Sequence, residues 1–145
     1  CIKRRDEGNM WWRVAVEMDL EIKLARVARH VFFGEVYGQV QDLKYGQRGA
    51  TFRVFDVLDA ETGRYLDHYR SRMAAANVGL EWVPTLHIGP WDPAMAPAFA
   101  EGKSTLADHV REGFVVKPLH ERWEKCCGRV ILKQHGQGYL TRKGG

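Results

Sequence analysis

The sequence predicts a mixed α+β domain. Two segments carry apolar residues at helical spacing, and several short runs between and after them are rich in valine and phenylalanine, as strands are. No internal repeat, low-complexity tract or linker interrupts these patterns. A length of 145 residues, of which 45% are hydrophobic, is sufficient for one domain with a sizeable core.

The first elements are a helix and two strands. Residues 11–28 place apolar side chains at helical spacing with charged residues between them, and Asn9 is a suitable N-cap. Runs rich in valine and phenylalanine then predict strands over residues 30–37 and 51–58.

The later elements alternate between short helices and short strands. We expect, in order, a turn at 61–64, an amphipathic helix over 65–78, an extended segment over 82–88, a short helix over 93–99, and strands over 113–118 and 128–135. Pro84 lies in the extended segment and suggests an edge or a bend there.

Composition narrows the class of protein only a little. The formal charge is +4, from 22 basic and 18 acidic residues, which permits a polyanionic partner without requiring one. Three cysteines, two of them adjacent, suit neither a disulfide framework nor a zinc knuckle, so we expect reduced thiols and a cytoplasmic protein. No apolar run approaches the about 18 residues that span a bilayer, and no membrane partner is expected.

Charged residues stand at the ends of the last two strands. Residues 111–118 read REGFVVKP, so Glu112 precedes an apolar run and Lys117 follows it. The second strand brings Lys133, with His135 two positions further on the same face. We expect burial of the apolar residues of both strands, Val115, Val116, Val130, Ile131 and Leu132. Charged side chains beside such a core are expected to face a ligand. A carboxylate can bind a metal ion, and lysines can bind phosphate oxygens.

Two further motifs occur earlier in the chain. Residues 33–38 read FGEVYG, and residues 52–57 read FRVFDV. Together with EGFVVK and the later LK, the order is FGExxG, FxxFD, EGxVxK, LK. This order resembles motifs III, IIIa, IV and V of the covalent nucleotidyltransferases, the superfamily of ATP-dependent ligases and mRNA capping enzymes. Residues 39–46 and 139–145 are similar to the RNA ligases, and CIKR at residues 1–4 resembles motif Ia of bacteriophage RNA ligases that seal nicks in double-stranded RNA.

The resemblance implies a fold, an activity and partners. Residues 1–145 would be part of an adenylyltransferase domain with antiparallel sheets and flanking helices. Such an enzyme joins RNA 5′-phosphate and 3′-hydroxyl ends through lysyl-AMP and RNA-adenylate intermediates. We therefore expect ATP and Mg²⁺ or Mn²⁺ as ligands, nicked or broken RNA as substrate, and a monomer.

The resemblance also implies roles for three residues of the last two strands. Glu112 would hold the metal ion. Lys117 and Lys133 would supply positive charge to the phosphate oxygens and so count as catalytic. Related RNA ligases often have a lysine or a small residue at the position of His135, and a neutral imidazole is a weaker phosphate partner.

Four residues would complete the nucleotide site by the same resemblance. Glu35 would contact the ribose, Phe55 would stack on adenine, and Asp56 would orient neighbouring groups or a metal-bound water. Arg4 would contact the phosphate of the adenylate or of the RNA end. The residues alone also permit simpler structural roles. Glu35 could be a surface carboxylate, Phe55 a core residue, and Arg4 part of a solvated basic cluster. Strand alternation predicts that Phe55 and Val57 lie on one face of the strand and that Asp56 and Val54 lie on the opposite face. Gly34 could allow the ligand to approach the backbone closely, because it has no side chain.

The nucleophile of the superfamily is the lysine of a Lys-x-Asp-Gly motif, and none of the lysines here is followed by x-Asp-Gly. The chain begins at Cys1, already in the motif that normally follows the nucleophile, so we expect an N-terminally incomplete domain that is inactive in the first step. One alternative is a non-catalytic module that binds nucleotide or RNA. Another is a DNA ligase or capping-type domain, which residues 139–143 disfavour.

Overall fold

The computed structural model describes residues 5–6, 8–37, 50–106 and 110–142 of the chain. These residues form two compact units, which divide Cys1–Val83 from Pro84–Gly145. Each unit is considered by itself below. No helix in the described part of the chain is both long and apolar enough to cross a membrane.

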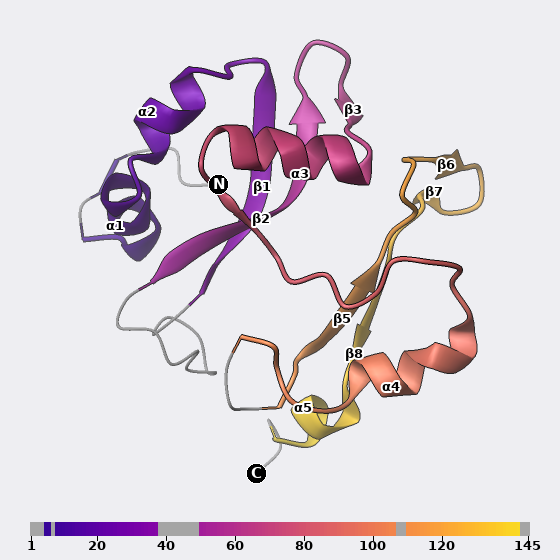
Figure 1. Cartoon of the computed structure of the whole chain (residues 1–145). Coiled ribbons are helices and arrows are strands. Elements are labelled where there is room, and N and C mark those ends of the chain that lie inside the picture. Colours follow the sequence, from indigo (N-terminus) through magenta and orange to yellow (C-terminus); the bar gives the residue numbers. More distant parts are fainter. Residues whose placement is uncertain (1–4, 7, 38–49, 107–109, 143–145) are drawn as a thin grey trace. The chain divides into compact units, whose positions relative to one another are not determined.

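The first unit begins with two helices where one was expected over residues 11–28. Helix α1 spans Met10–Glu17 and helix α2 spans Leu20–Ala25 (Figure 1). Asn9 caps α1 as predicted, because its side chain accepts a hydrogen bond from the Trp11 amide at 3.0 Å. The break falls at Asp19, whose φ of 53° is left-handed and cannot continue a right-handed helix.

A mainly antiparallel sheet forms the centre of the first unit. Strand β1 (His30–Tyr37) pairs antiparallel with β2 (Thr51–Asp59), and β3 (Arg64–Tyr65) continues the antiparallel order. Strand β4 (Glu81–Trp82) pairs parallel with β2 and is much shorter than the extended segment expected over 82–88. The predicted strands over 30–37 and 51–58 are therefore confirmed.

Helix α3 (His68–Asn77) supplies the cover of this sheet and confirms the second predicted helix, with a later start. It packs against β2 and β4, and Figure 1 shows it beside β2. The buried core that results consists of Val54, Val57, Ala74, Ala75, Val78 and Leu80. Alanines on the helix and valines on the strand allow close contact between the two elements.

A β-bulge interrupts the pairing of β1 with β2. Phe33 is opposite Asp56, but its neighbour Gly34 is opposite Val54, so Phe55 is the extra residue of β2. The bulge changes which face each following side chain occupies. Val54 and Val57 are consequently both fully buried, and the predicted simple alternation over this strand is wrong.

The second unit contains two small antiparallel sheets. Its elements are the 3₁₀ turn η1 (Pro93–Met95), α4 (Ala96–Ala100), β5 (Gly113–Val116), β6 (Trp123–Glu124), β7 (Gly128–Arg129), β8 (Leu132–His135) and α5 (Gln137–Arg142). Strand β5 pairs with β8, and β6 pairs with β7 (Figure 1). The strand expected over 128–135 is thus two strands in different sheets.

Helix α4 packs against β5 and β8. Phe99 of the helix contacts Phe114 of β5, with ring centroids 6.1 Å apart, and Trp91 lies 5.8 Å from Phe114. These aromatic rings form the apolar centre of the second unit.

The expected burial of the last two strands is largely wrong. Val115 is 51% exposed, Ile131 42% and Leu132 61%, whereas Val116 and Val130 are half-buried. A two-stranded sheet has two faces, and successive side chains point to opposite faces. Val115 lies on the face that carries Lys133 and His135, opposite the neighbouring Phe114.

Candidate active site

The pairing of β5 with β8 brings Glu112 next to two side chains of β8. Lys133 and His135 lie on one face of that strand, since they are two residues apart. Oε1 of Glu112 is 3.8 Å from Nζ of Lys133 and 3.8 Å from Nδ1 of His135. The three side chains are 33%, 58% and 38% exposed in that order, so the group is open to a ligand.

Gly113 makes this arrangement possible. Its φ is +154°, and a Cβ at this position would overlap the carbonyl oxygen of Gln134 and lie 2.8 Å from Cα of His135. Backbone atoms of β8 cannot move aside without breaking the pairing, so only glycine fits. Glu112 precedes β5, which explains why it faces β8 although it is five residues from Lys117.

His135 is held on its other side by helix α5. Its ring stacks on Tyr139, with centroids 6.0 Å apart and an interplanar angle of 15°. The backbone amide of Gln137, at the start of α5, donates a hydrogen bond of 2.6 Å to Glu101. His135 therefore has a defined position beside Glu112, which the sequence could not indicate.

Lys117 lies at the other end of β5 from Glu112. It directly follows the strand and is half-buried. Five residues of extended chain span about 16 Å, so Lys117 is well separated from the Glu112 carboxylate along the strand. The structure therefore brings together Glu112 and Lys133, and it places Lys117 near the start of β8.

The three predicted site residues of the first unit lie on β1 and β2. Glu35 is exposed and pairs with Arg53, on the sheet face opposite Val54 and the core. Phe55 is 39% exposed at the bulge, whereas Asp56 is only 3% exposed. Phe55 is therefore accessible to a ligand, and Asp56 is suited to orienting other groups from within the protein.

Gly34 has a packing role inside the sheet. A Cβ at this position would overlap the Phe52 ring, whose Cε2 atom would be 2.6 Å away, and the carbonyl oxygen of Arg53. The space that we expected a ligand to need is occupied by the Phe52 side chain. Glycine is required here because two strands and an aromatic ring meet at one point.

Arg53 is a residue of this face that the sequence analysis did not single out. Its guanidinium lies 2.7 Å from Glu81 and 5.3 Å from the centroid of the Tyr37 ring. The side chain is 19% exposed. Its position between Phe52 and Phe55 in the FRVFD motif was the available signal, since cross-strand pairing places it beside Glu35.

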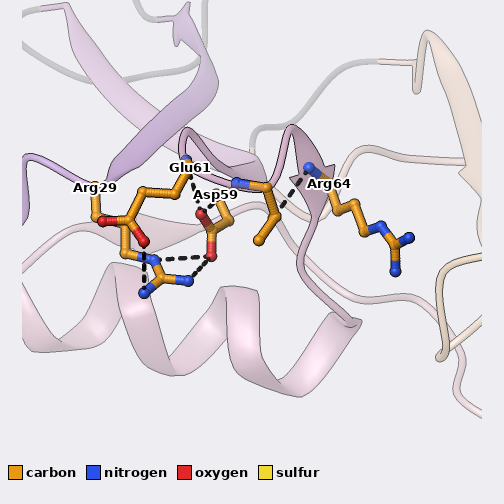
Figure 2. A network of polar contacts seen from close by, with 5 residues as sticks. Arg29, Asp59, Glu61 and Arg64 are labelled. Carbon is orange, nitrogen blue, oxygen red and sulfur yellow. Dashed lines mark hydrogen bonds and ion pairs between the residues drawn. The ribbon is translucent and has the colours of Figure 1, made fainter.

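A second polar network stabilises the far end of β2 (Figure 2). Arg29 donates hydrogen bonds to Oδ2 of Asp59 and contacts Glu61 at 3.0 Å. Oδ1 of Asp59 accepts from the backbone amides of Glu61 and Thr62 at 2.9 and 3.1 Å. The hydrogen bond from Arg29 is the main cause that lowers the pKa of Asp59 to about 2, against the opposing effect of burial. Every oxygen of this carboxylate is engaged, which fits a structural role in the turn.

Two predictions concern residues outside this description. Arg4 and residues 39–46 lie outside the described residues, so their predicted roles stay predictions. Among the residues that the structure describes, no group of three or more histidine, cysteine, aspartate or glutamate side chains is placed to hold a metal ion.

The motif order resembles that of ligase-type nucleotidyltransferases, and the antiparallel sheets and the Glu112–Lys133 pair are compatible with such a domain. The model of a family described as RNA ligase matches residues 2–135. The chain belongs to the RNA ligase family, which confirms the resemblance and favours it over the DNA ligase or capping-type alternative. No curated protein matches the chain.

Solved structures of the Naegleria gruberi RNA ligase share the fold. A variant with ATP and manganese is 22% identical with a TM-score of 0.79, and the match covers 96% of this chain and 42% of that one. The ligase with pyrophosphate is 22% identical, with a TM-score of 0.79 and coverages of 97% and 42%. A variant without ligand is 23% identical, with a TM-score of 0.82 and coverages of 97% and 42%. The chain thus spans about two fifths of the length of these structures, and the predicted fold class is confirmed.

Proposed function

We propose that this chain, over residues 1–145, is part of the adenylyltransferase domain of an ATP-dependent RNA ligase that joins RNA 5′-phosphate and 3′-hydroxyl ends. The observation that carries the proposal is the contact of Glu112 with Lys133. Two motifs that are separated in the sequence meet there as a carboxylate and an ammonium group, at 3.8 Å. Such a pair suits the chemistry of metal-bound phosphates.

Lys133 and Lys117 would neutralise charge on the phosphate oxygens of ATP and of the RNA adenylate. Glu112 would hold a divalent cation, Mg²⁺ or Mn²⁺. A single carboxylate fits such an ion, because Mg²⁺ keeps several waters and is bound through one or two carboxylates together with substrate phosphates. The bound cation would add further positive charge at the reacting phosphate.

The first unit would supply the contacts to the nucleoside. The partly exposed ring of Phe55 offers a face for adenine, and Glu35 offers an exposed carboxylate for the ribose hydroxyls. Buried Asp56 would orient groups nearby, and Arg4 would contact the phosphate of the adenylate or the RNA end. The Naegleria gruberi ligase has been solved with ATP and manganese and with AMP and manganese. These complexes support an adenine nucleotide and a divalent metal ion as ligands of this chain.

The wider setting follows from the resemblance to bacteriophage RNA ligases. We infer a cytoplasmic monomer that acts in RNA repair, with nicked or broken RNA as its substrate and no membrane partner. The mild excess of basic over acidic residues is compatible with RNA.

Binding of ATP with Mn²⁺, measured by calorimetry, tests the proposal. The chain should bind the nucleotide, Lys133→Ala should weaken binding, and Lys23→Ala on α2 should serve as a charge-matched control with no effect. In a ligase that contains this chain, Lys133→Ala should slow adenylation by about 10²–10³-fold, as loss of one group that stabilises developing charge does. Equal effects of the two lysine substitutions would contradict the role of Lys133.

A second candidate function is a non-catalytic module that binds nucleotide or RNA. It is favoured by one observation, the lack of a lysine followed by x-Asp-Gly. The chain given labelled ATP and Mg²⁺ should therefore form no covalent AMP adduct that survives denaturing electrophoresis. A Lys-x-Asp-Gly sequence encoded upstream of Cys1 would favour the ligase, and its absence from the gene would favour the module.

A further inference from the structure

A short hairpin projects from the chain between the two lysine motifs. Strands β6 and β7 form its arms, and we call residues 122–130 the β6–β7 hairpin. The turn closes through a hydrogen bond of 3.4 Å from the Cys127 amide to the Glu124 carbonyl. The base closes through a bond of 3.1 Å from the Val130 amide to the Arg122 carbonyl.

A largely buried ion pair fixes the base of this hairpin. Arg129 donates two hydrogen bonds to the carboxylate of Glu121, at 2.8 and 2.6 Å. Both side chains are nearly buried, at 13% and 12% exposure. A two-point pair of this kind holds geometry better than a single contact does, so the hairpin is a preorganised surface.

The hairpin presents one large aromatic side chain to solvent. Trp123 is 68% exposed, the highest value among the exposed large hydrophobic side chains of the described residues. Its ring lies next to Gly128, where an added Cβ would be 3.5 Å from the ring. A tryptophan in this state exposes apolar area that a stacking ligand would cover.

Basic side chains accompany this ring. Arg122 and Lys125 are both exposed, on either side of Trp123 in the sequence. Glu124 is the exposed carboxylate of the hairpin, and the charge of Glu121 is matched by Arg129. An exposed aromatic ring and exposed cations on one hairpin are groups that can bind a nucleic-acid strand, with a base on the ring and phosphates on the charges.

We propose that the β6–β7 hairpin is an RNA-binding surface, on which Trp123 stacks on an unpaired base while Arg122 and Lys125 contact the neighbouring phosphates. This inference rests on the proposed function and adds a place where the RNA strand is held, separate from the residues assigned to ATP. The ring is 68% exposed, so removing it should leave the fold intact.

Fluorescence anisotropy with labelled single-stranded RNA tests the surface in the full chain. Trp123→Ala should weaken RNA binding by about 5–150-fold, the loss expected for one stacked base. Trp11→Ala is the matched control, because Trp11 is also exposed, at 54%, but lies on α1. Equal RNA affinity of the two variants, or no RNA binding by the unmodified chain, would overturn the proposal.

The two basic residues are tested by the dependence of binding on salt. The pair Arg122→Gln and Lys125→Gln should weaken binding and reduce the slope of log affinity against log salt by about 1.4, or about 0.7 for each lost phosphate contact. Arg13→Gln with Arg26→Gln, at exposed positions on the helical segment, is the charge-matched control. An unchanged slope in the hairpin variant would contradict the phosphate contacts.

Chemical footprinting gives the location directly. Cys126 and Cys127 are exposed free thiols in the turn of the hairpin. RNA should slow their alkylation, measured on the peptide by mass spectrometry, and this protection should be lost in Trp123→Ala. Full reactivity in saturating RNA would place the RNA elsewhere and refute the surface.

Nucleotide binding separates this proposal from the wider one. Trp123→Ala should bind ATP with Mn²⁺ as tightly as the unmodified chain. If ATP binds and the hairpin variant keeps its RNA affinity, only the hairpin proposal fails. If ATP does not bind at all, the proposed function fails whatever the RNA result. A Trp123→Ala variant that loses self-association and keeps its RNA affinity would reassign the surface to a protein contact.

Discussion

Two phenylalanines on β2 should respond in opposite ways to substitution by leucine. Phe55 is 39% exposed at the bulge, whereas Phe52 packs against the core and fills the space beside Gly34. If Phe55 stacks on adenine, Phe55→Leu should lower ATP affinity and leave the fold nearly unchanged. Phe52→Leu is the matched control and should mainly lower stability.

The size of both effects follows from exposure. Replacing phenylalanine by leucine removes roughly one methylene-equivalent of buried area, worth about 0.8 kcal/mol when it is fully buried. About three fifths of the Phe55 surface is buried, so we expect a loss of about 0.5 kcal/mol, which is a shift of about 1–2 °C in a domain of this size. A stacked base contributes about 1–3 kcal/mol, which is about 5–150-fold in affinity.

Two measurements on each variant separate these outcomes. Thermal denaturation gives the change in stability, and calorimetry with ATP and Mn²⁺ gives the affinity per folded molecule. The expected result is a large affinity loss with a small shift in Tm for Phe55→Leu, and the reverse for Phe52→Leu. Unchanged ATP affinity in a Phe55→Leu protein of reduced stability would refute the stacking role.

Two further predictions concern stability. Gly113→Ala should destabilise the protein far more than Gly128→Ala in urea denaturation. A Cβ at position 113 clashes with the β8 backbone, whereas a Cβ at position 128, where φ is +74°, meets only the Trp123 ring at 3.5 Å. Similar losses of stability in the two variants would contradict the clash. Asp59→Asn should lower stability at pH 7, and the difference should shrink as pH falls from about 5 towards 2. The pKa of Asp59 is lowered from 3.8 to about 2, so its stabilisation is complete above the higher value and is lost near the lower one. A difference that persists at pH 2 would contradict that origin.

The motifs were predictable from the sequence because each is short and local. FGEVYG, FRVFDV and EGFVVK mark the strands on which they lie, and the structure confirms these strands over most of their lengths. The meeting of Glu112 with Lys133 was not predicted, because it depends on the antiparallel pairing of β5 with β8. The position of His135 beside Glu112 and its stacking on Tyr139 depend on helix α5. No pattern in the sequence predicted this helix.

Features that depend on tertiary pairing were not predictable. No glycine or proline marks Asp19, where the helix breaks. Met18, the residue before it, contacts β2, since the Phe52 amide lies 3.3 Å from its sulfur. The exposure of Val115 was missed because strand-like composition indicates burial on a sheet, not which face a helix covers. Such errors arise where a partner element, rather than the local sequence, decides the outcome.

The bulge links two motifs whose roles the sequence treats as separate. Gly34 of FGEVYG leaves room for the Phe52 ring, and the register of β1 against β2 changes immediately before it. That change makes Phe55 the extra residue of FRVFDV and leaves its ring partly exposed instead of alternating into the core. A side chain larger than glycine at position 34 would force Phe52 to move, and the offset that exposes Phe55 depends on the same contact. If Phe55 stacks on a base as proposed, the glycine of one motif would act on nucleotide binding through the aromatic residue of the next, by fixing the strand geometry that exposes Phe55.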